Sequence, residues 1–192
     1  GDAHFIVLNT GDSEETAGQL TDAQFNWLKE DLKNTKKTWK IIAMHNPLYS
    51  PGKYGSQEGK NTEALLLREQ LNQLLVDNKV DLVLNGHDHM YSRTYPVSAK
   101  GEPITDTPTE TADFNGTQVE YLVNPKGPVH LESGCSGNQG RWTIDGLEEK
   151  YARMFQEKED MDTKYVSYSA ISINGNRLTV NYYMITIKTK EA

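Results

Sequence analysis

Three histidines stand where the sequence pattern predicts that strands end. His45 directly follows one apolar run, and His87 and His89 follow another, immediately after Gly86. Functional side chains of open α/β sheets gather at strand ends, and neutral imidazole is a good ligand for zinc, iron, manganese or nickel. Gly86 allows the chain to turn here, so His87 and His89 either turn toward one ion or serve different ions. The spacing therefore predicts a metal site built from the three histidines and favours two ions.

Other residues of metal-binding type have a structural interpretation. His4 and His130 lie at the start of strands or within them, without partners, and we interpret both as structural. The one cysteine, Cys135, lies among small residues in SGCSGN and is expected to be a buried thiol. A single structural zinc on three histidines is disfavoured, because such sites usually include cysteine and are closed by four ligands.

The first half of the chain must position these histidines, and its pattern is strand–helix–strand–helix–strand. The second strand would carry His45 at its end, and the third would carry His87 and His89. Thr21, with Gln24 three residues later, has the form of a capping box that opens the first helix. Such an order implies parallel strands with right-handed crossovers. The expected elements are strand 5–8, helix 22–34, strand 39–44, helix 62–77 and strand 82–84.

The second half of the chain changes character. Residues 100–118 are rich in Thr, Pro, Gly and Asp and are expected to form a long surface loop. Residues 127–134 resemble a strand that ends in glycines, and residues 146–160 resemble a short, charged helix. The clearest local signal is in residues 164–188, where Asn174-Gly175-Asn176 joins two alternating β-rich runs in a hairpin.

Together these elements predict one α/β domain, with a parallel half over residues 1–99 and an antiparallel half over residues 100–192. The 192 residues, 36% of them hydrophobic, are enough for one substantial core, and no apolar run is long enough to cross a bilayer. The net charge of -7, without a basic stripe, argues against a nucleic-acid partner. An anionic substrate would need a local positive centre, which a bound metal could supply.

The histidine motifs resemble those of a known family. The run from Gly86 to Arg93 is similar to the GHxHxYxR form of the GHxH motif of the calcineurin-like metallophosphoesterases, in their purple acid phosphatase-like branch. The segment that ends at His45 resembles the preceding VxxH motif, with Ile42 in the valine position. The Q-x-x-W-L helix of the family, its glycine-ended strand and its closing strands also have counterparts. These are Gln24 with Trp27 and Leu28, the segment PVHLESGCSGN, and the terminal hairpin.

This resemblance implies a fold, a site and an activity. The fold would be the C-terminal part of a four-layer α/β/β/α sandwich. His45 and His87 would bind one metal ion and His89 the other, with iron, zinc or manganese as the ions. In the family, a metal-bound hydroxide attacks the phosphorus of a phosphate ester. Placement outside the cell or at its surface is also implied by the resemblance.

The upstream ligand motifs of the family have no convincing counterpart. Asp2-Ala3-His4 precedes its strand instead of following it, and Gly11-Asp12 is not followed by GNH[DE] before His45. The chain also enters an apolar run within four residues of Gly1. We therefore expect a partial catalytic domain whose upstream half supplies Asp and Asn ligands, and we expect the 192-residue chain alone to be inactive.

The loop after His45 lacks the histidines that purple acid phosphatases often carry there. Its sequence is NPLYSPGKYGSQ, in which Tyr54 and Lys53 are the plausible substitutes for those histidines. Asn46, Tyr54 and Arg93 are the candidates for contacts to phosphate or to the metal ligands. Asp88, between the two histidines, is expected to support the loop. Substrate preference is therefore left open by the sequence.

A second functional hypothesis is a non-catalytic metal- or surface-binding module that keeps the fold. The two hypotheses differ in what they expect upstream of this sequence in a longer parent protein. The phosphatase hypothesis requires the motifs D-x-[HG], GD and GNH[DE] there, and the binding-module hypothesis does not. Asn115-Gly116-Thr117 is a glycosylation sequon if the protein enters a eukaryotic secretory pathway.

Overall fold

The computed structural model describes residues 1–11, 18–52, 54–55, 62–136, 151–155 and 165–186. A mixed six-stranded sheet lies at its centre, with the strand order β1-β2-β3-β7-β4-β8. The strands are β1 (Ala3–Val7), β2 (Trp39–Ala43), β3 (Leu82–Asn85), β4 (Tyr91–Thr94), β7 (Val129–Ser133) and β8 (Ala152–Phe155).

The sheet is parallel from β1 to β7 and antiparallel beyond it. β1, β2, β3 and β7 pair in parallel, while β4 pairs antiparallel with both β7 and β8. β3 and β4 are consecutive strands, yet β7 lies between them in the sheet. The short segment from Gly86 to Met90 therefore passes from β3 to β4 across the end of β7.

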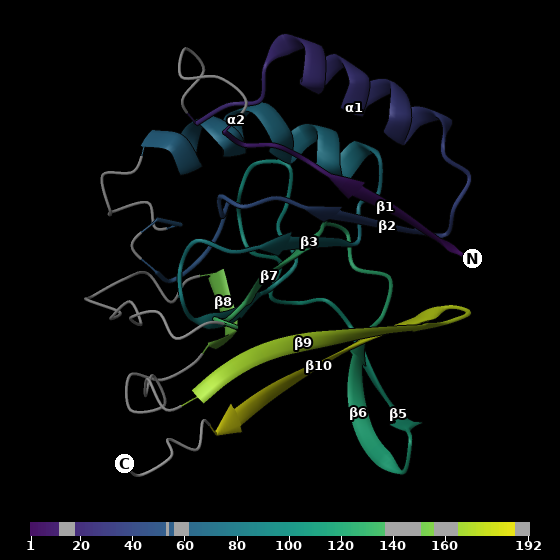
Figure 1. The fold of residues 1–192 in the computed structure, drawn as a ribbon. Coiled ribbons are helices and arrows are strands. Elements are labelled where there is room, and N and C mark those ends of the chain that lie inside the picture. Colours follow the sequence, from purple (N-terminus) through teal and green to yellow (C-terminus); the bar gives the residue numbers. More distant parts are fainter. Residues whose placement is uncertain (12–17, 53, 56–61, 137–150, 156–164, 187–192) are drawn as a thin grey trace, which may run out of the picture.

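Two helices cover one face of the sheet (Figure 1). α1 (Asp22–Asn34) is capped by Thr21, whose hydroxyl accepts a hydrogen bond from the Gln24 backbone N–H. α2 (Thr62–Asp77) is followed by Lys79 in the left-handed region, with φ 53°. Leucines of both helices pack on the inward side chains of the strands in one apolar core. Its members include Ile6, Leu28, Leu32, Ile42, Leu67, Leu71, Leu75 and Val83.

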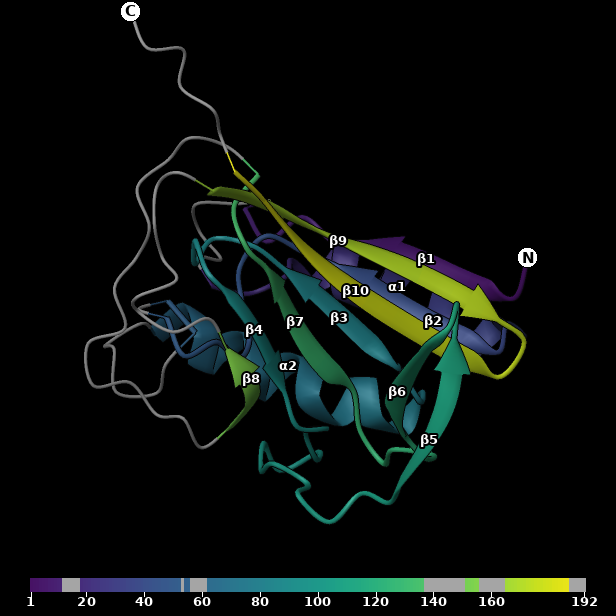
Figure 2. The same cartoon turned by 90° about the horizontal axis from the view of Figure 1, so that it is seen from below.

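Two hairpins lie on the opposite side of the sheet (Figure 1; Figure 2, turned by 90°). One consists of β9 (Tyr165–Asn174) and β10 (Arg177–Thr186), and the other of β5 (Thr109–Phe114) and β6 (Thr117–Leu122). The β9–β10 hairpin and the sheet share a second apolar core, which includes Ile41, Leu82, Leu131, Leu178 and Val180. The described residues thus form a helix layer, a mixed sheet and a second β layer.

Much of the expected fold is confirmed. Both helices have the predicted bounds, and the strands at 5–8, 39–44, 82–84 and 127–134 are present with small shifts at their ends. The terminal hairpin turns at Gly175-Asn176, where Gly175 has φ 57°. Among the described residues, no helix is long and apolar enough to span a membrane.

Three expectations about the second half were wrong. Residues 100–118 are not one loop, because they hold β5 and the start of β6, which are joined at Asn115-Gly116 with φ 52° and 84°. The described part of the expected helix 146–160, from Tyr151 to Phe155, is mostly strand β8, which pairs with β4. The parallel part of the sheet also includes β7 from beyond residue 99, and the antiparallel part includes β4 from before it.

Candidate metal centre at the carboxyl edge of the sheet

The carboxyl ends of β2, β3 and β7 meet at one edge of the sheet, which we call the carboxyl edge. His45 follows β2 after one residue, and His87 follows β3 after one residue. Backbone pairing continues past the strand ends, because Met44 N–H donates to the Leu84 carbonyl and Gly86 N–H donates to the His45 carbonyl at 3.1 Å. This pairing brings the two histidine segments side by side.

The rings of His45 and His87 meet at this edge. His45 Nε2 lies 2.9 Å from His87 Nδ1, and the rings are edge-on, with centroids 4.8 Å apart. His87 has φ 75°, in the left-handed region, so its side chain turns toward His45 rather than continuing the strand. Gly86 lies against the His45 ring, where an added Cβ would make an ordinary contact at 3.5 Å with His45 Nδ1.

The nitrogen pair fits one metal ion. Two nitrogens that bind an ion at about 2.1 Å are about 3.0–3.4 Å apart for bond angles between octahedral and tetrahedral. The observed 2.9 Å is close to the short end of this range. The pKa of His87 is lowered, first by burial and then by the neighbouring His45, which favours the neutral ring that binds metals.

His89 does not join this pair in a three-residue ligand cluster. In the part of the chain that the structure describes, no group of three or more His, Cys, Asp or Glu side chains could hold a metal ion. His89 is partly buried and lies within electrostatic range of His87. The described residues therefore contain one two-nitrogen site, with the third predicted ligand nearby but separate from it.

Asp88 anchors the turn that carries both histidines. Its side chain is fully buried and accepts hydrogen bonds from Ser50 Oγ at 2.8 Å and from the backbone N–H groups of Tyr54 and Gly55 at 3.2 Å. A Cβ on Gly52 would lie 2.3 Å from the carboxyl carbon of Asp88, so the loop wraps closely around this group. Asp88 therefore ties the loop after β2 to the histidine turn after β3.

Glu132, at the end of β7, holds the same turn from the other side. Its Oε1 accepts from the Asp88 backbone N–H at 3.2 Å, and the residue is 1% exposed. Burial and the neighbouring Asp88 carboxylate raise the pKa of Glu132 well above its usual value. Burial also raises the pKa of Asp88, against the hydrogen bonds that it accepts. Two carboxyl groups thus lie directly behind the histidine turn.

Asn46 lies beside His45 in a polar cluster. Its side-chain N–H donates to Glu63 Oε2 at 3.0 Å, and its Oδ1 accepts from the Thr10 hydroxyl at 2.8 Å. Its backbone carbonyl accepts from Asn85 Nδ2. The side-chain amide is therefore held in one orientation by groups from two different segments, and Asn85 holds the backbone.

The other candidate contacts are divided between two places. The Tyr54 ring stands edge-on to His87, with centroids 4.1 Å apart, so Tyr54 belongs to the carboxyl edge. Arg93 lies instead in a cavity under the hairpins, on the opposite face of the sheet from the helices. It is not brought to the histidine pair.

The histidines that were interpreted as structural have structural contacts. His4 Nε2 is 2.5 Å from Asp31 Oδ2 on α1, and His130 is buried beside the Tyr49 ring. Cys135 is a buried free thiol. Residues 12–17, which include Asp12, lie outside the described residues, as does Lys53.

Sequence reasoning missed Glu132 and Glu63. Glu132 is next to Asn85 in the parallel register of β3 and β7, so it would have been expected at the carboxyl edge had this pairing been foreseen. The sequence does show a strand over VHLES, but it does not say which strand is its neighbour. Glu63 follows undescribed residues at the start of α2, and no local pattern marks it.

Comparison with known proteins gives this site a context. Residues 4–91 match the calcineurin-like phosphoesterase family. An acid phosphatase from Aspergillus ficuum is 34% identical over 60% of this chain and 17% of its own length. Purple acid phosphatase 15 from Arabidopsis thaliana is 26% identical over 76% of this chain and 22% of its own length.

A solved structure shows the same fold. The purple acid phosphatase from yellow lupin seeds superposes with a TM-score of 0.69 at 20% sequence identity, covering 95% of this chain and 28% of that chain. The chain is thus similar to the calcineurin-like phosphoesterases over residues 4–91 and to purple acid phosphatases in sequence and in fold. It spans about a fifth of the length of the two phosphatases that it matches in sequence.

Proposed function

We propose that this chain is the later part of the catalytic domain of a metal-dependent phosphoric ester hydrolase with two metal ions. The observation that carries the proposal is the His45–His87 nitrogen pair, at 2.9 Å, at the carboxyl edge of a phosphatase-like sheet. Two convergent neutral imidazoles have the donor set and spacing for one ion. His89 would contribute to a second ion.

The anionic ligands would come from outside this chain. Neutral nitrogens alone bind divalent ions weakly, and the two carboxyl groups behind the turn are buried in hydrogen bonds to the loop and the turn. We therefore assign the Asp and Asn ligands to an upstream half of the same domain, as the small fraction of each relative that the chain covers also suggests. On this proposal, the 192-residue chain alone has no activity.

The residues of this chain would act by positioning. Asp88 and Glu132 hold the histidine turn, and Asn46 offers a fixed amide beside His45. Tyr54 packs its ring edge-on against His87 and would help to orient it. When bound, the ions would neutralise phosphoryl oxygens and lower the pKa of a bound water. They would also supply the positive centre that a chain of net charge -7 lacks.

The metals and the location follow from the same proposal. Imidazole with carboxylate and amide ligands suits iron, zinc and manganese. Secretion or display at the cell surface is part of the same proposal and follows from the family resemblance alone. The exposed Asn115 at the β5–β6 turn would then be accessible for glycosylation.

The test uses a longer protein that carries this chain. We expect about two metal ions per chain by elemental analysis, and His89→Ala should remove about one of them with most of the p-nitrophenyl phosphate hydrolysis. His45→Ala should affect the other ion. His4→Ala is the matched control, because His4 contacts Asp31 on α1, away from the carboxyl edge.

Two results would decide against the proposal. Full hydrolysis in His89→Ala would contradict the ligand assignment. Bound metal without hydrolysis in the wild type would favour a non-catalytic metal-binding module on this fold. For the 192-residue chain itself, turnover that survives repurification and disappears on chelation would show that no upstream half is needed.

A further inference from the structure

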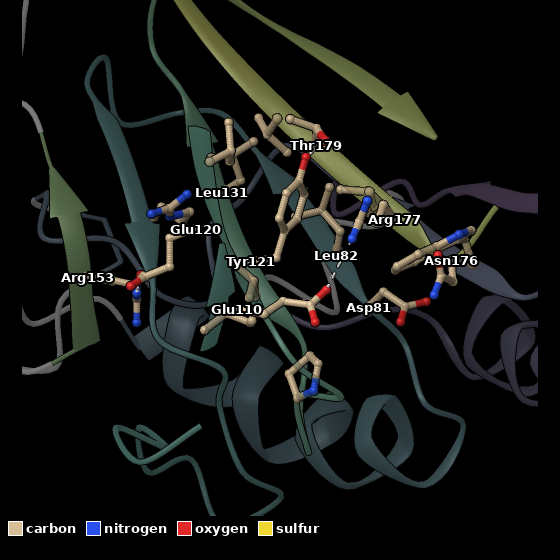
Figure 3. Close-up of a pocket in the computed structure, with 18 residues that line it drawn as sticks. Asp81, Leu82, Glu110, Glu120, Tyr121, Leu131, Arg153, Asn176, Arg177 and Thr179 are labelled. Atoms are coloured by element: carbon tan, nitrogen blue, oxygen red, sulfur yellow. Dashed lines mark hydrogen bonds and ion pairs between the residues drawn. The ribbon is translucent and has the colours of Figure 1, made fainter. Parts of the chain in front are cut away.

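A cavity lies under the two hairpins, at the end of the sheet opposite the histidines. Its volume is about 180 Å³, and its walls come from the sheet, from the β5–β6 hairpin and from β10 with the preceding turn (Figure 3). Trp39 and Leu82, which line it, begin the same strands, β2 and β3, after whose other ends His45 and His87 lie. The cavity is therefore separate from the candidate metal centre.

The middle of the cavity is apolar. Leu82 and Leu131 contribute from the sheet and Val180 contributes from β10, and all three belong to the core shared by the two β layers. The ring of Tyr121 stands among them, and its hydroxyl is hydrogen-bonded to Thr179 Oγ1 at 2.8 Å (Figure 3). This middle region suits a flat apolar group.

Most of the charged groups around the cavity are already paired. Arg177 lies 3.6 Å from Glu110, and Arg153 forms an ion pair with Glu120 (Figure 3). Asp81 accepts a hydrogen bond from the backbone N–H of Lys40 at 2.8 Å. These pairs leave one cation of the cavity wall to consider.

Arg93 is the cavity cation without a carboxylate. It has no ion pair with any described residue, and its Nε is buried without a hydrogen-bond partner among them. It lies directly opposite Leu131 across the β4–β7 pair, so its side chain leaves the sheet beside the apolar middle. A buried, unsatisfied guanidinium donor is costly, and an anion bidentate on it would remove that cost.

We propose that this cavity is a second binding site, for a small ligand with one apolar ring and one carboxylate. The carboxylate would bind Arg93, and the ring would lie on Leu82, Leu131 and Val180. The size supports a single ring, because a dry cavity of about 150 Å³ binds benzene, whereas drug-sized ligands need about 300 Å³ or more. The proposal does not depend on the metal centre.

The experiment titrates the 192-residue chain with benzoate in the presence of a chelator. The indole N–H resonance of Trp39 reports on the site, since Trp39 lines the cavity and donates to the Gly175 carbonyl. We expect saturable shifts of this resonance. Arg93→Met should weaken benzoate binding at least about tenfold, because it removes a charge-assisted bidentate contact.

Two comparison ligands separate the contributions of the ring and of the carboxylate. Benzyl alcohol keeps the ring without the charge, and acetate keeps the charge without the ring, so both should bind at least about tenfold more weakly than benzoate. Val119→Phe, which fills the cavity from the exposed β6 side, should block benzoate while Arg93 is intact. His87→Ala should leave benzoate binding unchanged, which distinguishes this site from the metal centre.

Three outcomes would overturn the proposal. Benzoate could leave the Trp39 resonance unchanged at saturating concentration. Benzoate could bind Arg93→Met as tightly as it binds the wild type, while the two proteins show the same thermal unfolding. If benzyl alcohol shifted the Trp39 resonance with the same affinity as benzoate, the cavity would be an apolar crevice without a carboxylate site.

Discussion

His87 has a backbone φ of 75°, in the left-handed region that few residues with a side chain adopt. This conformation costs about 1–3 kcal/mol and persists only where the surroundings determine it. Here Asp88 supplies that determination, because its side chain and its backbone N–H are both bonded into the protein. The orientation of His87 toward His45 is therefore fixed by the fold, before any ion binds.

His130 shows the opposite use of a histidine. It is 1% exposed, and burial, helped by the charge of Arg68, lowers its pKa to about 3. Above pH 6.5 the ring is neutral in both the folded and the unfolded chain. Between pH 6.5 and 3 only the unfolded chain takes up the proton, so the stability falls as the pH falls.

We therefore predict that His130→Phe flattens the pH dependence of folding. Between pH 7 and pH 5, the loss in the free energy of unfolding should be smaller than in the wild type by about 2 kcal/mol. Urea unfolding at the two pH values measures this loss. His4→Gln removes a histidine from the partly exposed pair with Asp31, and its loss in the free energy of unfolding between the two pH values is the comparison. An unchanged loss in His130→Phe would mean that His130 is protonated in the folded protein.

Among the elements, those with a local signal were predictable. The capping of α1 and the leucine spacing of α2 placed both helices, because these features act within one or two turns. Asn115-Gly116 is an equally local hairpin signal, but the polar composition around it is typical of a loop. The stretch from Ala152 to Phe155 is a strand because of its pairing with β4, which no local pattern contains.

The candidate site divides in the same way. The positions of His45 and His87 after apolar runs follow from the sequence alone. The role of Glu132 depends on β7 lying next to β3, and the distance of Arg93 from the histidines depends on which face of β4 it occupies. Both are properties of strand order, which periodicity does not encode.

The loop after β2 is held mainly by its bonds to Asp88, and Arg68 on α2 adds a bond to the Leu48 carbonyl at 2.5 Å. We predict that Asp88→Asn lowers the free energy of unfolding by about 2–3 kcal/mol, because a buried amide cannot accept all of these bonds. Denaturant titration at pH 7 measures it. Asp113→Asn, at an exposed acceptor of the Gly116 N–H, should change stability by less than about 0.5 kcal/mol. Equal effects would show that Asp88 does not organise the loop.

At the scale of the whole molecule, β1 is the edge strand of the six-stranded sheet and exposes apolar side chains. Phe5 is 55% exposed and Val7 is 70% exposed. An uncharged edge with exposed apolar residues can pair with another chain. In the longer protein that we propose, this edge is a surface for the upstream half of the domain.

We predict that the 192-residue chain self-associates as its concentration rises and that Val7→Lys reduces this association at least about tenfold, because an edge lysine opposes strand pairing. Sedimentation velocity over a concentration series measures it. Gln118→Lys adds the same charge on exposed β6 and should have little effect. If both lysines reduce association equally, net charge rather than the β1 edge is responsible.

The insertion of β7 between β3 and β4 has a consequence for the order of folding. β3 and β4 are close in the chain, and β3 pairs with β2, but β4 cannot take its final place beside β7 until β7 arrives from a distant segment. Closing so long a loop is entropically unfavourable. The turn with His87 and His89 spans the end of β7, and Glu132 on β7 holds it. The histidine pair is thus completed at a late step of folding. A chain that has folded only its first three strands and two helices would carry all three histidines and still lack the geometry to capture metal.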